Sequence, residues 1–466
     1  MGVSVERGKG STDPPSRDLL RDVKTFRAWD VNQAWLLPPS VRELVPADDP
    51  AHLVRDLVRQ DLDLSGILET YDEERGFPPY HPTMMTALLL YAYTQGVYSS
   101  RKMASACHRR VDFMAVTAMQ KPDFRTISDF RKRHLEALGG LFQQVLRLCA
   151  RAGLVKLGHV ALDGTKVAAN ASKHKAMSYD RMKKTEKELA ATVAEWFAKA
   201  DAADDAEDRE YGSDKRGDEM PDWVSDKQKR LEKIRAAKTE LEAEAKRQLA
   251  VEAEKKAKDD DGPRRPPRGG KKRPKKNGEP HDKAQLNFTD GDSRVLKGTT
   301  GYVQGYNCQA AVDTTAQVIV AHSVSNAQND VSELVPMVAQ IRTHLRQTPT
   351  ELSADAGYLS ESNLAALTRR RIRGYIATGR LAHDGDKKRR RKLLGRRTLA
   401  MRTKLDRAGR RSRYRLRKHT VEPVFGQIKE DRGFRRFFLR GLRKVPHEWA
   451  LLCTAHNVLK LIRRAA

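Results

Sequence analysis

The sequence predicts a mixed α/β domain that follows an all-helical region and is interrupted by a long helical insertion. Three observations support this prediction. Residues 46–155 carry apolar side chains at helical spacing. Apolar strand patterns begin at Val160 and resume at Val303. Between them, residues 174–258 are rich in Ala, Lys, Glu and Asp and lack the alternation typical of strands. The 466 residues are enough for two or three domains with cores of their own.

The charge of the chain predicts a polyanionic partner. Lys and Arg total 89 against 61 Asp and Glu, which gives a formal net charge of +28. Such an excess favours nucleic acid as the partner but does not separate an enzyme from a packing protein. The four cysteines lie far apart in the sequence and form no Cys-x-x-Cys pair. A zinc site and a disulfide framework are therefore not expected, and a reducing cytoplasm fits.

The N-terminal third is expected to be helical after an irregular, polar lead-in over residues 1–45. One helix begins with Pro82 in its first turn and ends by Gly96. Basic side chains alternate with the apolar positions of this region, so we expect a helical DNA-binding domain over 46–155. A helical bundle with an ordinary solvated surface has the same pattern. The candidate DNA contacts in this region are Arg101, Lys102 and Arg131.

The insertion over 174–258 predicts two long helices that pair with each other in antiparallel fashion. Its residues assign it no chemistry. Dimerisation, holding of DNA ends and service as a plain spacer all remain open. Residues 259–284 are rich in Pro, Gly, Lys and Arg and have no means of forming a core, so a basic disordered linker is expected there.

The rest of the chain alternates strand and helix patterns. Two strands, Val303–Val312 and Val318–Val324, are joined by a turn, and a helix, a short strand ending at Asp355, another helix and another strand follow. A basic stretch over 380–418 precedes two terminal helices. Counted from Val160, three strands come before the first internal helix, which is the order of a ribonuclease H-like domain over 156–173 and 285–466.

Three carboxylates are the candidate functional residues. Asp163 and Asp355 each end an apolar strand pattern, with a glycine one or two residues later, and Glu422 begins a later helix pattern. An Asp-Gly pair after a strand is also an ordinary turn signal. If the fold gathers the three side chains, their charges repel unless a hard cation such as Mg²⁺ or Mn²⁺ neutralises them. Two such ions can promote in-line displacement at a phosphodiester.

Pro423 bears on the position of Glu422. Proline is tolerated without cost in the first turn of a helix, so we expect the helix cap near Thr420 and Glu422 in the first turn. There the helix dipole favours an ionised carboxylate. Lys429 lies seven residues further on and close to the same face, where it is a candidate phosphate contact or simply a solvated lysine.

At these residues the sequence resembles the DDE transposases of bacterial insertion sequences, from about Phe77 to the C-terminus. The resemblance is carried by "PDFRTISDFRKRH", "ALDGTKVAANASKHKAMSYDRM", "NFTDGDSRVLKG", "GYNCQAAVD", "SADAGY" and "VEPVFGQIKEDRGFRRFFLRGL". It implies that Asp163, Asp355 and Glu422 are the catalytic, metal-binding acids. It also implies nicking at the ends of the element, attack of the freed 3′-hydroxyl on target DNA, and a homodimer in a synaptic complex.

The family pattern around the glutamate is Tyr, two residues, Arg, three residues, Glu, six residues, Lys. Lys429 keeps the last spacing. Tyr414 and Arg417 keep the first, but four residues separate Arg417 from Glu422. In the alternative register, Arg415 takes the tyrosine place and Lys418 the arginine place. Both pairs remain candidate DNA contacts.

Two other classes of function share these features. One is a domesticated or catalytically idle relative, or a basic packing protein, that binds nucleic acid without cutting it. The other is a ribonuclease H-like nuclease without strand transfer. The sequence contains no apolar run long enough to span a membrane, and we expect a cytoplasmic, nucleoid-associated protein of a bacterium.

Overall fold

The computed structural model describes residues 40, 43, 45–71, 79–211, 222–258, 275, 277–298, 301–379 and 395–465. The chain divides into two units between Ser40 and Val41, and only the second unit is described below. Most of the predicted lead-in and residues 259–274 of the predicted linker lie outside the described residues. No helix within the described ranges is long and apolar enough to cross a membrane.

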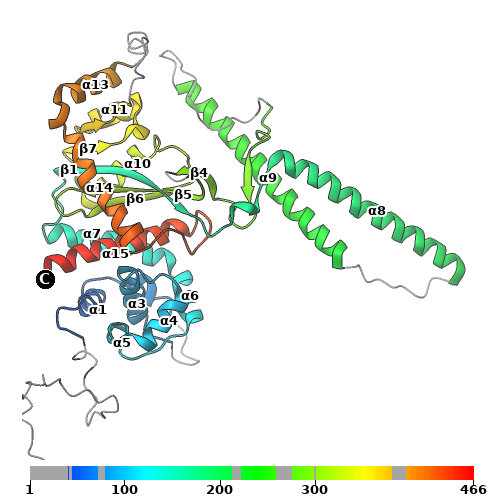
Figure 1. Ribbon diagram of the computed structural model, residues 1–466, viewed down its shortest axis with the longest axis horizontal. Coiled ribbons are helices and arrows are strands. Elements are labelled where there is room, and N and C mark those ends of the chain that lie inside the picture. The colour runs from blue at the N-terminus through cyan, green and yellow to red at the C-terminus, as the bar shows by residue number, and fades with distance from the viewer. Residues whose placement is uncertain are drawn as a thin grey trace, which may run out of the picture. The chain divides into compact units, whose positions relative to one another are not determined.

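The region before the first strand is helical, as predicted (Figure 1). Its elements are α1 (Pro50–Gln60), α2 (Ser65–Leu68), α3 (Pro82–Thr94), α4 (Ser100–Arg109), α5 (Val111–Thr117), α6 (Phe124–Arg133) and α7 (Leu135–Arg151). Pro82 is the first residue of α3, and Gly96 follows its end with a φ of 71°. Helix α3 is apolar on all sides, and nearly all of its side chains are buried.

A mixed sheet follows. Its strands are β1 (His159–Ala168), β4 (Arg294–Gly298), β5 (Gly301–Asp313), β6 (Ile319–Ser325), β7 (Glu351–Ala354) and β8 (Arg373–Ile376). The order across the sheet is β4-β5-β1-β7-β8, and β6 pairs with β5. The pairs β4-β5, β5-β6 and β5-β1 are antiparallel, whereas the pairs β1-β7 and β7-β8 are parallel. The predicted hairpin of β5 and β6 and the predicted strand before Asp355 are confirmed; β4 was not predicted.

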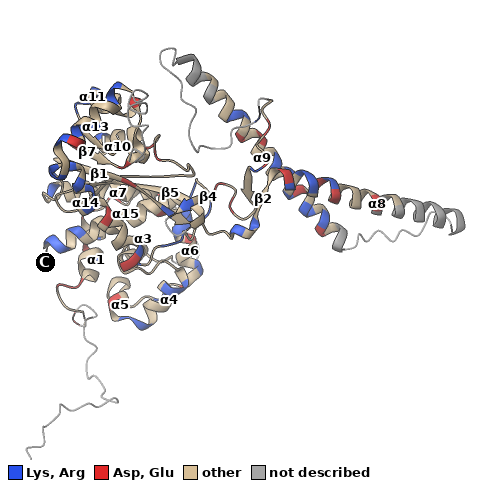
Figure 2. Cartoon of the chain, turned by 45° about the horizontal axis from the view of Figure 1, so that its top comes forward, with Lys and Arg blue, Asp and Glu red and all other residues tan. Residues whose placement is uncertain are grey.

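The insertion consists of α8 (Tyr179–Tyr211) and α9 (Asp222–Lys258), which confirms the two predicted helices. Tyr179 bonds to Glu242, and two turns further along α8 Glu186 bonds to Arg235 and Lys238. Because later residues of α8 contact earlier residues of α9, the two helices run antiparallel. Both signs of charge mingle along them (Figure 2). A small two-stranded sheet, β2 (Ala176–Ser178) with β3 (Gln285–Asn287), joins the ends of the insertion.

The remaining helices complete the core. They are α10 (Leu334–Leu345), α11 (Glu361–Arg369), α13 (Arg396–Ala408), α14 (Leu416–Gly426) and α15 (Val445–Ala465). Helix α13 lies in the basic stretch for which the sequence predicted no element. Helix α15 packs against α7, α3 and β6, so one continuous apolar core joins the N-terminal helices to the sheet. Helix α14 packs on β1, β5 and β7.

The close pairing of β5 with β1 supports a stability prediction. Gly305 pairs with Ala168, and a Cβ added at Gly305 would lie 2.1 Å from the carbonyl oxygen of Val167. We therefore expect Gly305→Ala to lower the free energy of unfolding by about 3 kcal/mol, because rigid backbone must move. The matched control is Gly140→Ala in α7, where nothing lies within 4 Å. This control should raise the free energy of unfolding, measured by urea denaturation, by about 0.5–1 kcal/mol. Equal effects of the two substitutions would contradict the prediction.

Candidate active site

The sheet register sets two of the predicted acids side by side. Leu162 pairs with Ala354, and this is the last paired position between the parallel strands β1 and β7. Asp163 follows Leu162 and Asp355 follows Ala354, so both acids lie at the same edge of the sheet. The side chain of Asp355 accepts a hydrogen bond from the backbone N–H of Gly357 at 2.8 Å, which closes a short turn beyond β7.

The prediction that the strand pattern ends at Asp163 was wrong. Strand β1 continues to Ala168, because its other edge stays paired with β5 as far as Gly305. Asp163 therefore lies within the strand, opposite Ala310, and the Asp163-Gly164 pair forms no turn. The Asp163 carboxylate therefore lies where β1 is no longer paired with β7 but is still paired with β5.

The predicted position of Glu422 in a first helical turn was also wrong. Helix α14 begins at Leu416, so Glu422 lies in its interior and Pro423 is an internal proline. Proline cannot donate the hydrogen bond that the carbonyl of His419 would otherwise accept. The side-chain amide of Gln317 donates to that carbonyl at 3.0 Å instead. This contact from outside the helix satisfies the acceptor that the proline leaves free.

Arg417 joins Glu422 to Asp163. Its Nη1 donates to Oδ2 of Asp163 at 2.5 Å, and its Nη2 lies 2.8 Å from Oε1 of Glu422. The side chains of Arg417 and Asp163 are 14% and 16% exposed, whereas that of Glu422 is 44% exposed. Of the two registers that the sequence left open, the structure sets Arg417 against the acids, while Lys418 is exposed.

Charge at this edge is shared among the three acids. Burial raises the pKa of the Asp163 carboxyl to about 6. The Arg417 guanidinium and the N–H of Gly164 oppose this rise, and the negative charges of Asp355 and Glu422 add to it. The negative charges of Asp355 and Glu422 therefore act on the ionisation of Asp163.

The donor chemistry fits a hard divalent cation, since it consists of carboxylate oxygens. The arrangement does not: among the described residues, no three His, Cys, Asp or Glu side chains stand close enough to hold a metal ion. Arg417 accounts for part of this misfit, because its guanidinium takes one oxygen each of Asp163 and Glu422. An ion held by these acids would have to replace Arg417 as their counter-charge.

Asp330 is a further carboxylate at this edge that the sequence analysis missed. It accepts hydrogen bonds from the side-chain amides of Asn307 at 2.6 Å and Gln309 at 2.7 Å, and Nζ of Lys166 lies 3.5 Å from it. Asp330 stands in a polar loop after β6, where an acid reads as an ordinary turn residue. No pattern local to the sequence distinguishes it; only its long-range partners do.

Asp330 is one of the close neighbours of the two glycines that follow the predicted acids; Gln309 Nε2 is closer still to Gly164, and the Asp355 carboxylate to Gly357. A Cβ added at Gly164 would lie 3.0 Å from one Asp330 oxygen, and a Cβ added at Gly357 would lie 3.1 Å from the other. The Asp330 carboxylate thus lies between the segments that follow Asp163 and Asp355. Glycine at both positions lets this carboxylate approach the backbone closely.

The predicted DNA contacts around α14 differ in their surroundings. Arg415 and Lys418 are exposed, and the Tyr414 ring lies 5.9 Å from the guanidinium carbon of Arg417. Lys429 lies in a single π-helical turn, Gln427–Asp431, and its Nζ donates to the carbonyl of Lys166 at 2.8 Å. Burial lowers the pKa of Lys429. Contact of Lys429 with a phosphate would have to compete with this bond.

One predicted DNA contact in the helical region is corrected. Arg131 is only 5% exposed, and its guanidinium donates to the carbonyl of Tyr98 at 3.0 Å and to the hydroxyl of Tyr93 at 3.4 Å. These bonds hold α3 to α6, so Arg131 supports the fold and does not face a DNA phosphate. Arg101 and Lys102 are exposed on α4, and their contact with DNA stays a prediction.

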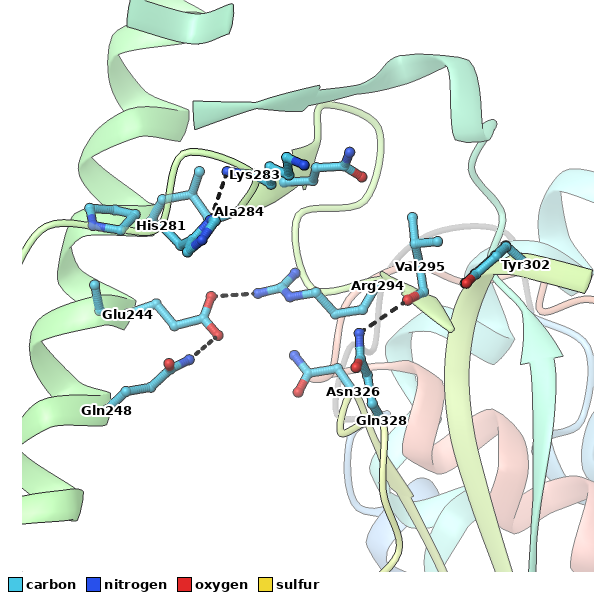
Figure 3. A pocket seen from close by; sticks show the side chains of 14 residues that line it. Glu244, Gln248, His281, Lys283, Ala284, Arg294, Val295, Tyr302, Asn326 and Gln328 are labelled. Carbon is cyan, nitrogen blue, oxygen red and sulfur yellow. Dashed lines mark hydrogen bonds and ion pairs between the residues drawn. The ribbon is translucent and has the colours of Figure 1, made fainter. Parts of the chain in front are cut away.

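A polar hollow lies where the insertion meets the sheet (Figure 3). Arg294 of β4 bonds to Glu244 of α9 at 2.7 Å, and Gln248 donates to the same carboxylate at 3.0 Å. On the sheet side, Gln328 donates to the carbonyl of Val295. The polar groups of the hollow largely pair with one another, so they fix α9 to β4.

Two family models match the chain. A model described as a transposase domain (DUF772) matches residues 39–133, which include α1 to α6. A model described as a transposase DDE domain matches residues 228–458. Asp355 and Glu422 lie within the second match, whereas Asp163 lies between the two. No curated protein and no solved structure matches the chain.

Proposed function

The chain belongs to the DDE transposases of the insertion-sequence type, and from this premise we propose that it cuts DNA at the ends of its element and joins those ends to target DNA. The observation that carries the proposal is the register that makes Asp163 and Asp355 neighbours at one sheet edge. Glu422 is tied to the same edge through Arg417. Both observations support a site built from acids of three remote parts of the chain.

The fold that we propose for the catalytic part is ribonuclease H-like. Supporting this are the antiparallel strands β6, β5 and β1 and the parallel strands β7 and β8 that follow on the other side of β1. The helical insertion lies between β1 and β5 in the sequence. The edge at which β1 leaves β7 is then the place where a phosphodiester would be bound.

We propose that Asp163, Asp355 and Glu422 bind Mg²⁺, or Mn²⁺ in its place, once Arg417 has withdrawn. When bound, such ions supply the Lewis acidity that activates an oxygen nucleophile and stabilises the leaving oxygen. The protein itself holds the acids at one edge of the sheet, with the Asp330 carboxylate between the segments that follow Asp163 and Asp355. Water breaks the P–O bond at the end of the element and leaves a 3′-hydroxyl and a 5′-phosphate. The 3′-hydroxyl then attacks a target phosphodiester, and as the new P–O bond forms the target's P–O3′ bond breaks and its 3′-oxygen leaves as a hydroxyl. No bond to the protein forms in either step.

The partner in this proposal is DNA, both the inverted repeats at the ends of the element and the target. Arg415, Lys418, Arg101 and Lys102 are exposed cations that phosphate can reach. Because two DNA ends are joined in a coordinated way, we propose a homodimer in a synaptic complex, acting at the nucleoid in the bacterial cytoplasm.

The test is incubation of the purified protein with Mg²⁺ and DNA that carries the inverted repeats flanking the reading frame, together with a target plasmid. We expect nicks at the repeat ends and covalently joined products on a denaturing gel. A retarded DNA band without any cutting would identify a binding protein. Cutting without joining would identify a nuclease. Either result would overturn the proposal.

A further inference from the structure

Five arginines surround one hollow away from the carboxylates. The hollow has a volume of about 610 Å³, and it is lined by Gln347, Thr348 and five arginine residues, which we call the arginine cluster: Arg342, Arg346, Arg369, Arg370 and Arg371. No Asp or Glu lines this hollow. Within the described part of the chain, no ion pair is recorded for any of the five.

The ends of two helices build the cluster. Arg342 lies in the last turn of α10, and Arg346 ends that helix with a φ of 58°. Arg369 lies in the last turn of α11, and Arg371 follows with a φ of 58°. Glycine is the usual residue in this left-handed conformation at a helix end. At both ends the chain has an arginine instead, at some cost in backbone strain.

The charges of the arginine cluster favour an anion in the hollow. Guanidinium groups stay charged at any physiological pH, so the cations repel one another across the hollow. The negative ends of the helix dipoles of α10 and α11 offset only part of this repulsion. A neighbouring hollow toward α7 is lined by Arg147, Arg151 and again Arg346, together with one acid, Asp61. Lys and Arg are visible around α11 in Figure 2.

The cluster and the carboxylates lie at opposite edges of the sheet. Arg346 precedes β7 and Arg371 precedes β8, whereas Asp355 follows β7. The four residues of β7 separate these edges by about 13 Å of strand. A phosphate held by the cluster is therefore a different phosphate from the one at the acids.

We propose that the arginine cluster binds the phosphate backbone of duplex DNA at phosphates other than the one that is cut. The partner follows from the chemistry, since planar guanidinium groups bind phosphate oxygens in pairs and DNA supplies phosphates at regular spacing. That the ligand is DNA rests on the proposed function. The contact itself requires no catalysis and is independent of sequence.

The experiment measures the affinity for a labelled duplex that lacks the inverted repeats, in EDTA, by fluorescence anisotropy over a range of salt concentrations. The test variant is Arg342→Gln/Arg369→Gln/Arg371→Gln. The control variant removes the same charge from three scattered, exposed arginines, as Arg230→Gln/Arg443→Gln/Arg464→Gln. Because cleavage is absent in EDTA, failure here is separate from failure of the proposed activity.

We expect the cluster variant to lose affinity about tenfold or more and to lower the salt slope by about 2 to 3, as three lost phosphate contacts require. The control should change both quantities much less. Equal losses in the two variants would mean that only net charge matters, and no loss in the cluster variant would mean that DNA does not dock there. Either result overturns the proposal.

A second measurement uses the unaltered protein and so does not depend on how the variants fold. Phenylglyoxal modifies accessible arginines, and peptide mass spectrometry locates the adducts. We expect the same short duplex to protect Arg342, Arg369 and Arg371 from modification. Unchanged modification of all three at saturating DNA would overturn the proposal.

Discussion

Asp163→Asn, Asp355→Asn and Glu422→Gln are each expected to abolish cleavage of DNA that carries the element's ends. Each amide keeps the size of the side chain and removes one anionic oxygen ligand from the edge where β1 leaves β7. A loss of about 4 kcal/mol in transition-state stabilisation corresponds to about a thousandfold lower rate. Nicking of an end-labelled duplex in Mg²⁺, followed over time on a denaturing gel, measures it.

Binding should respond in the opposite direction from cutting. Removing a negative charge next to a phosphodiester weakens repulsion, so affinity for the same duplex should stay equal or rise slightly. Asp406→Asn serves as the control, because that carboxylate is 65% exposed and pairs with Arg402 on α13. It should cut normally. Cleavage at the normal rate by any of the three amide variants would remove that residue from the catalytic set.

The sequence was sufficient to predict that Asp163 and Asp355 would lie at one edge of the sheet. Both follow short apolar runs, and parallel strands bring the residues that follow such runs to one edge. The runs around Val160 and Leu352 are buried on both sides, so their pattern reflects the sheet directly. Local patterns of this kind also predicted the helices of the insertion and the β5–β6 hairpin.

The features that the sequence did not predict depend on contacts between residues that are far apart in the chain. Pro423 is internal to α14 because Gln317, far back in the chain, satisfies the carbonyl that the proline leaves free. Arg131 is buried because two tyrosine neighbours accept its hydrogen bonds. The position of Asp330 near Gly164 and Gly357 depends on hydrogen bonds from side-chain amides of remote residues. None of these partners is implied by local periodicity.

Arg417→Gln is expected to destabilise the protein in the absence of divalent ions by about 2–3 kcal/mol, because it leaves the buried carboxylate of Asp163 without its counter-charge. The guanidinium now offsets the effect of burial on the pKa of Asp163. In the variant that pKa should therefore rise above about 6. The added loss of stability should grow as the pH increases from about 6 toward the raised pKa, because Asp163 must then ionise without a counter-charge. Urea unfolding in EDTA at several pH values measures both effects.

The same variant tests whether Arg417 and a divalent ion compete for the acids. In the unaltered protein, binding of Mg²⁺ must first break the ion pairs of Arg417 with Asp163 and Glu422. In Arg417→Gln no such contact opposes the ion, so the rise in melting temperature on adding Mg²⁺ should be larger. Arg435→Gln, which removes an exposed pair with Glu430, should change stability by no more than about 0.5 kcal/mol and leave the Mg²⁺ effect unchanged. Equal Mg²⁺ effects in Arg417→Gln and the unaltered protein would mean that the guanidinium is no competitor. The acids would then have to bind the ion with Arg417 still in place, as part of the site.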